Sequence, residues 1–271
     1  MFCIYLVKDS NMKYLNSDYK LFSNTFEILA RKHGYFYIWE DFLDLFINGF
    51  SFNHKIDLSH IQSKYTKEER LKFGLLIKEV ILLLDKKITS DNSWYDFFGS
   101  FYEEVSLSKQ QGFAQFFTPG TVCNFMAQIL SPQKNENFSD PCCGSGRFSL
   151  ASNSVNLGMF HFLVDIDYTC TKMSSLNLMM HGIRGVVICD DGLFPNKSFK
   201  GAFLINRNLA YTKIPEIEFV SNVNEAYNYV RTQIFTKEDF INENKIEEIK
   251  KEDDFKDVQE FVSKNGQLQL F

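Results

Sequence analysis

The stretch Phe138-Ser139-Asp140-Pro141-Cys142-Cys143-Gly144-Ser145-Gly146-Arg147-Phe148 decides the fold of this chain. It begins as a short strand that ends in an acid, and its two glycines then allow the backbone to turn tightly into a helix. The N–H groups at the start of such a helix face a bound ligand. The stretch therefore predicts a strand, a turn and a helix, with a ligand site at the carboxyl end of the strand.

Two later strands also end in acids. The apolar run Phe160–Val164 precedes Asp165, which stands about 20 residues after the glycines, where an acid can hold ribose hydroxyls. The run Val186–Cys189 precedes Asp190 and Asp191. The carboxyl ends of parallel strands meet at one edge, so these acids are predicted to surround one crevice of an α/β domain with a wound parallel sheet. The alternative, that the acids only cap helices, does not account for the glycine pair.

A second motif precedes the first strand. In Phe116-Phe117-Thr118-Pro119, Thr118 suits a helix N-cap and Pro119 the first helical residue, with the helix expected to end near Leu130. Together with Asp140–Gly146, this motif resembles the N6-adenine DNA methylase family, the modification subunits of type I restriction systems. The resemblance covers about residues 109 to 210. It implies a Rossmann-like class I S-adenosylmethionine methyltransferase sheet, shortened in this chain and preceded by an all-α N-terminal domain.

The resemblance also implies a role for each matching residue. Thr118 and Pro119 would line the methionine end of S-adenosylmethionine, and Asp140 would accept from its ammonium group. Asp165 would bind the ribose hydroxyls, and Asp191 would accept from the adenine amino group, with Asp190 as the alternative. The implied cofactor-binding residues are Thr118, Pro119, Asp140, Pro141, Gly144, Gly146, Asp165, Ile166, Asp191 and Leu193.

A nicotinamide dinucleotide is the rival cofactor, because Gly144, Gly146 and an acid near residue 165 satisfy that pattern loosely. The third glycine is missing, since Ser149 stands in its place, and this reading gives no role to Thr118. No metal site is expected, because the six cysteines form no CxxC pair and show no Cys/His spacing suited to zinc.

The methyl-transfer motif is incomplete. The family carries Asn/Asp-Pro-Pro-aromatic after the fourth strand, whereas the strand expected at Ala202–Ile205 leads here into Asn206-Arg207-Asn208-Leu209. No two of the five prolines are adjacent, so the rigid turn is lost along with the stacking ring. Asn206 is the remaining catalytic candidate. The chain is expected to methylate adenine poorly or not at all alone, unless a partner such as a specificity subunit completes it.

Three regions are expected: a helical N-terminal domain at 1–108, a methyltransferase-like domain at 109–235, and an acidic arm at 236–271. Helical spacing of Phe22, Phe26 and Leu29 supports the first region, as does a capping box at Thr66 and Glu69. The aromatic stripe formed by Phe97, Phe98, Phe101 and Tyr102 is interpreted as core. With no basic leader and no apolar run of roughly 20 residues, a soluble cytoplasmic protein without membrane contact is expected.

The formal net charge of −5 is the wrong sign for a self-sufficient DNA binder, so direct DNA binding is expected to be weak. Most of that charge is local, because residues 237–257 carry nine acids and five lysines. The arm ends in Gln267-Leu268-Gln269-Leu270-Phe271, which resembles the peptide that docks on the bacterial sliding clamp, with Gln267, Leu268, Leu270 and Phe271 as contacts. The alternative function is therefore a non-catalytic cofactor-binding adapter recruited to the clamp.

Overall fold

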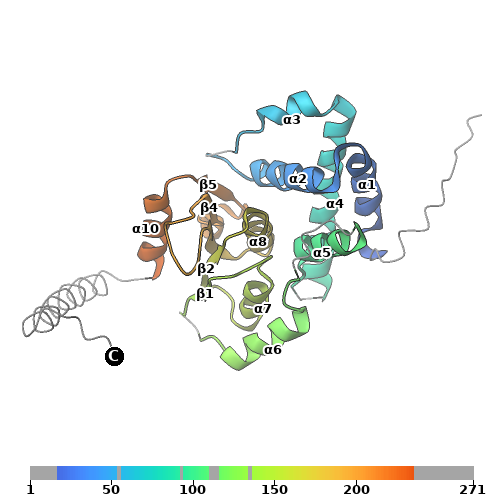
Figure 1. Cartoon of the computed structure of the whole chain (residues 1–271). Coiled ribbons are helices and arrows are strands. Elements are labelled where there is room, and N and C mark those ends of the chain that lie inside the picture. Colours follow the sequence, from blue (N-terminus) through green and yellow to red (C-terminus); the bar gives the residue numbers. More distant parts are fainter. Residues whose placement is uncertain (1–16, 54–55, 92–93, 110–115, 134–135, 235–271) are drawn as a thin grey trace, which may run out of the picture. The chain divides into compact units, whose positions relative to one another are not determined.

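The computed structural model describes residues 17–53, 56–91, 94–109, 116–133 and 136–234 (Figure 1). The chain divides into two compact units, residues 1–226 and residues 227–271. The expected arm at 236–271, with its clamp-like peptide, lies outside the described residues. None of the described helices is both long and apolar enough to cross a membrane.

The first part of the chain is helical, as its spacing predicts. Apolar side chains of α1 at Phe22, Phe26 and Leu29 are buried at helical intervals. The capping box is confirmed: the N–H of Glu69 donates to Thr66 Oγ1 at 3.2 Å, and the N–H of Thr66 donates to Glu69 Oε2 at 2.8 Å. The elements are η1 (Ser17–Tyr19), α1 (Lys20–His33), α2 (Tyr35–Gly49), α3 (Ser59–Lys64), α4 (Lys67–Asp91) and α5 (Phe97–Lys109).

Aromatic rings fill the interior of this helical layer. Phe22 meets Phe97 and Phe101 edge to face, with ring centroids 4.9 and 4.8 Å apart. Such pairs come from α1 and α5, which are far apart in the sequence. The interpretation of these aromatic side chains as core is thereby confirmed.

The second part of the chain is a five-stranded sheet with associated helices. The strands lie in the order β1-β2-β3-β4-β5, and β1, β2 and β3 run parallel. Helices α7 and α8 make the two crossovers between the parallel strands. The elements are α6 (Gly120–Leu130), β1 (Phe138–Asp140), α7 (Arg147–Val155), β2 (Phe160–Asp165), α8 (Tyr168–Met180), β3 (Arg184–Cys189), β4 (Gly201–Ile205), α9 (Leu209–Thr212), β5 (Ile217–Val220) and α10 (Val223–Ile234).

The expectation of a parallel sheet throughout is wrong for its last two strands. β4 runs antiparallel to β3, with Gly185 opposite Ile205 and Cys189 opposite Gly201, and β5 runs antiparallel to β4. A parallel crossover takes a dozen or more residues, usually with a helix. The described connection from Asp190 to Lys200 contains no helix and is shorter, so the chain returns directly beside β3.

The helices and the sheet share one hydrophobic core. Buried side chains from α1, α2 and α5 belong to the same cluster as those of α8, β3 and β4, and α8 packs against both α2 and α5. The expected boundary between residues 108 and 109 therefore does not separate two cores. This arrangement brings the helical region against the glycine turn, where the Ser145 hydroxyl donates to Asp96 Oδ2 at 2.6 Å.

Candidate functional site

A cavity of about 490 Å³ opens beside the carboxyl ends of β1 and β2. Its volume is in the range typical of small-molecule sites. It brings together residues of both sequence motifs: Thr118 from the first, and Asp140, Pro141 and Gly144 from the second, together with Asp165 at the end of β2. The cavity is lined by Phe116, Phe117, Thr118, Met126, Ser139, Asp140, Pro141, Cys142, Cys143, Gly144, Ser145, Arg147, Phe148, Asp165 and Cys170.

The two glycines allow the close approach of different neighbours. Gly144 has φ +55°, and a Cβ at this position would lie 2.8 Å from Cδ1 of Phe117. Gly146 has φ +86°, and a Cβ there would lie 3.1 Å from Cβ of Ser174 on α8. Gly144 thus lets the Phe117 ring lie against the turn, whereas Gly146 lets the turn pack on α8. Gly146 does not line the cavity.

Two carboxylates face the cavity. The N–H of Cys142 donates to Asp140 Oδ1 at 3.0 Å. Asp165 accepts at both oxygens, from the N–H of Gly144 at 2.8 Å and from that of Asp167 at 2.9 Å. Burial raises the pKa of both carboxyls, and the charge of Asp165 adds to the rise in the pKa of Asp140. Two partly desolvated negative charges therefore lie in one cavity, which favours a cationic ligand.

The motif before α6 differs slightly from expectation. The helix begins at Gly120 and is preceded by Pro119 in the N-cap position, so it starts one residue later than predicted, and it ends at Leu130 as predicted. Thr118 is not the N-cap. Its side chain is exposed and lines the cavity, while its carbonyl accepts from the Cys123 thiol at 3.6 Å.

The third strand end places its two acids differently. Asp190 is fully buried and accepts from the N–H groups of Asp191, Asn196 and Ser198, at 2.8, 2.6 and 2.9 Å. It therefore holds its own loop together. Asp191 is only half-buried and accepts from the N–H of Leu193 at 2.9 Å. Asp191 is thus the more accessible of the two acids, and its choice over Asp190 as a ligand group stays a prediction.

Not every expected residue reaches the cavity. Ile166 and Leu193 are 58% and 82% exposed, on the loops that follow β2 and β3. The second of these loops still lies close to the site, because a Cβ at Gly192 would approach the Pro141 carbonyl oxygen to 2.5 Å. The predicted cofactor-binding residues that do not line the cavity are Pro119, Gly146, Ile166, Asp191 and Leu193.

The location predicted for Asn206 is wrong. Because β4 is antiparallel, its carboxyl end lies at the edge opposite to Asp140 and Asp165. The Asn206 side chain is buried, and its Nδ2 donates to the carbonyls of Ile183 and Met179 at 3.0 and 3.1 Å. Asn206 thus ties the turn between α8 and β3, and it is not brought together with the cavity residues.

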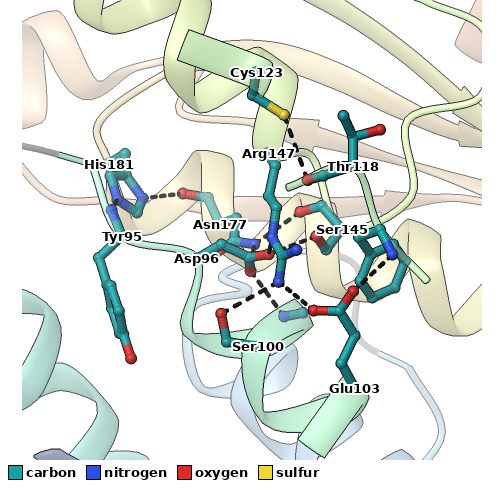
Figure 2. Close-up of polar contacts among 12 residues, drawn as sticks. Tyr95, Asp96, Ser100, Glu103, Thr118, Cys123, Ser145, Arg147, Asn177 and His181 are labelled. Atoms are coloured by element: carbon teal, nitrogen blue, oxygen red, sulfur yellow. Dashed lines mark hydrogen bonds and ion pairs between the residues drawn. The ribbon is translucent and has the colours of Figure 1, made fainter. Parts of the chain in front are cut away.

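A charged cluster supports the cavity, and sequence reasoning missed it. Figure 2 shows Arg147 reaching from α7 to the first turns of α5, where Nε donates to Asp96 Oδ2 at 2.6 Å and Nη2 to Glu103 Oε2 at 2.7 Å. Asp96 also accepts from the Ser145 hydroxyl and from Asn177 Nδ2, at 2.6 and 2.7 Å. An aspartate directly before a helix is typical of an N-cap, and Asp96 accepts from the N–H of Gly99 at 2.8 Å.

Comparisons with known proteins agree with this geometry. Residues 93–193 match the family model described as N-6 DNA Methylase. Over 80 residues the chain is 32% identical to the Type I restriction enzyme EcoEI methylase subunit of Escherichia coli. This match covers 29% of the chain and 16% of the relative, so the chain corresponds to a small part of that protein. No solved structure matches the chain. Residues 93–193, which contain the cluster and the cavity, are thus similar to the N-6 DNA methylase family.

Proposed function

We propose that this chain binds S-adenosylmethionine in the cavity beside β1 and β2 and serves adenine N6 methylation of DNA. The observation that carries the proposal is the convergence of two motifs, 20 or more residues apart in the sequence, on one cavity. Thr118 lies on one side of that cavity, and Asp140 and Asp165 lie at the strand ends. The match of residues 93–193 to the N-6 DNA methylase model supports the same cofactor.

The chemistry of the donor set fits this cofactor. S-Adenosylmethionine carries a cationic ammonium and a cationic sulfonium group, and its ribose offers two hydroxyl donors. Asp140 would accept from the ammonium, and Asp165 from the ribose hydroxyls. A cation in the cavity offsets the repulsion between the two carboxylates. The anionic pyrophosphate of a nicotinamide dinucleotide would be repelled by these two carboxylates.

The bound cofactor would supply an electrophilic methyl group, and the chain's own residues would hold the ligand and exclude water around it. An adenine acceptor also needs groups that hold its amino hydrogens. Asn206 does not fill that role, since its amide is bonded to backbone carbonyls at the opposite sheet edge. We therefore propose that methyl transfer requires a partner, as the word "subunit" in the name of the Escherichia coli relative suggests.

Calorimetry on the purified full chain tests the cofactor. S-Adenosylmethionine is expected to bind and NAD is not, and Asp140→Ala is expected to weaken binding at least tenfold because an ion pair in a partly buried site is lost. Asp85→Ala, on the exposed face of α4, is the matched control and leaves affinity unchanged. Binding of NAD in preference to S-adenosylmethionine would refute the proposal.

A methylation assay tests the need for a partner. The chain alone is expected to give no N6-methyladenine on duplex DNA, and addition of a specificity or methyltransferase subunit is expected to restore it. Robust methylation by the lone chain would show that the missing acceptor groups are present after all. Weak DNA binding by the chain alone follows from its net charge of −5.

A second candidate function rests on Gln267-Leu268-Gln269-Leu270-Phe271. These residues lie outside the described part of the chain, so their sequence alone supports the proposal. A peptide with three apolar anchors and a glutamine suits an apolar cleft with a polar lip. The chain would then be a non-catalytic, cofactor-binding adapter that the sliding clamp brings to DNA.

A further inference from the structure

One wall of the cavity is held by a side chain from the helical region. The segment Phe116–Thr118 belongs to no helix or strand. Its backbone is fixed where the N–H of Phe117 donates to Glu103 Oε1 at 2.7 Å. Glu103 lies on α5, so the helical region reaches directly to the backbone of this wall.

The same glutamate is also bonded to the first residue of α7, directly after the glycine turn. Its second oxygen, Oε2, accepts from Arg147 Nη2 at 2.7 Å. The Arg147 guanidinium also lies 5.6 Å from the centre of the Phe117 ring, and this ring packs against Gly144. Glu103 and Arg147 thus connect the two sequence motifs of the cavity through one ion pair (Figure 2).

The surroundings of Arg147 favour its charged form. The Arg147 side chain is 11% exposed, and Asp96 holds its Nε at 2.6 Å. Burial alone would lower the pKa of Arg147, but the neighbouring charges of Asp96 and Glu103 outweigh it and raise that pKa. A guanidinium held by two carboxylates in a planar fork is also geometrically restrained, which an ammonium on a flexible stem does not reproduce.

We propose that Glu103 and Arg147 are positioning residues, which fix Phe117 and Thr118 against the glycine turn and thereby preform the S-adenosylmethionine cavity. The proposal rests on the proposed function for the identity of the ligand. It makes α5 a component of the cofactor site, although the residues of α5 do not line the cavity. Neither residue is given this role by the sequence motifs.

The test uses Glu103→Gln, Arg147→Lys and the double variant of the full chain. Phe117 and Arg147 donate to different oxygens of Glu103, and a glutamine has a donor NH2 group in place of one of these oxygens. A lysine cannot bridge Asp96 and Glu103 with a planar fork. Each single variant is expected to weaken S-adenosylmethionine binding about tenfold, from the typical value of a charge-assisted hydrogen bond. The double variant is expected to lose little more affinity than either single variant, because both substitutions break the same ion pair.

A second readout needs no ligand. Cys123 is buried and its thiol contacts the Thr118 carbonyl, so release of the wall is expected to speed alkylation of Cys123 by iodoacetamide, measured by peptide mass spectrometry. Cys189, buried on β3, is the internal reference for global unfolding and is expected to stay protected. The matched control pair is Arg207 and Glu218, an ion pair at 2.6 Å on the other sheet edge. Arg207→Lys and Glu218→Gln are expected to change neither readout.

The outcomes separate the two proposals. If wild type fails to bind S-adenosylmethionine while the cluster variants still expose Cys123 alone, the proposed function is refuted and the positioning role stands. If Cys123 and Cys189 become reactive together, the pair only stabilises the fold, and the positioning role is overturned. Unchanged affinity with unchanged Cys123 reactivity overturns it as well, as do additive losses in the double variant.

Discussion

The substitution Asn206→Ala separates the two roles that sequence and structure give to this residue. In the structure its Nδ2 donates to the carbonyls of Ile183 and Met179, and its Oδ1 accepts from the N–H of Glu216 at 3.1 Å. The side chain is 1% exposed, and the backbone has φ +54°, a region that asparagine tolerates better than alanine. We expect a large loss of stability and no direct loss of ligand affinity.

The size of the effect follows from those contacts. Leaving a buried polar group without its partner costs about 1–3 kcal/mol, and three groups are affected, so the lower end of that range already gives about 3 kcal/mol. Alanine in the left-handed region adds about 1 kcal/mol. A total of about 4 kcal/mol corresponds to a fall in melting temperature of about 8–16 °C for a domain of this size.

Thermal unfolding by circular dichroism measures the first effect, and calorimetry with S-adenosylmethionine well below the melting temperature measures the second. Asn208→Ala, two residues away and exposed, is the matched control and is expected to change the melting temperature by less than about 2 °C. A variant Asn206→Ala with wild-type stability would refute the reasoning, because the buried hydrogen bonds would then contribute nothing.

Three further predictions concern Gly144, Asp140 and the C-terminal peptide. Gly144→Ala is expected to cost about 2–4 kcal/mol and to weaken S-adenosylmethionine binding in calorimetry, since a left-handed φ and a Cβ 2.8 Å from Phe117 both oppose it; unchanged affinity would contradict the packing of this turn. Asp140→Asn is expected to raise the melting temperature at pH 7 and to weaken the binding of S-adenosylmethionine. Folding raises the pKa of Asp140 above 3.8, so the ionised carboxylate destabilises the folded state. The stability of the wild type approaches that of the variant only as the pH falls through the raised pKa. A lower melting temperature of the variant at pH 7 would contradict this. Deletion of residues 267–271 is expected to abolish pull-down by the sliding clamp without changing the melting temperature, and retained pull-down would exclude the peptide as the contact.

Local signals in the sequence were sufficient for much of the fold. These signals depend on residues that are near one another in the chain, so the structure confirms them. They are the capping box at Thr66 and Glu69, the strand ends at Asp140 and Asp165, and the glycine turn. The helix after Pro119 was displaced by one residue because the Thr118 side chain lies at the cavity and does not cap the helix.

The sequence by itself predicted that its two motifs meet, and both line one cavity, since a strand followed by a glycine turn has few conformations open to it. Only the tertiary structure decided where the fourth strand lies. Its direction depends on the length of the connection before it and on pairing with β3, and this placed Asn206 at the far edge. Only the tertiary structure, again, brought Glu103 and Arg147 together, because an ion pair between residues 44 positions apart depends on packing that no local pattern encodes.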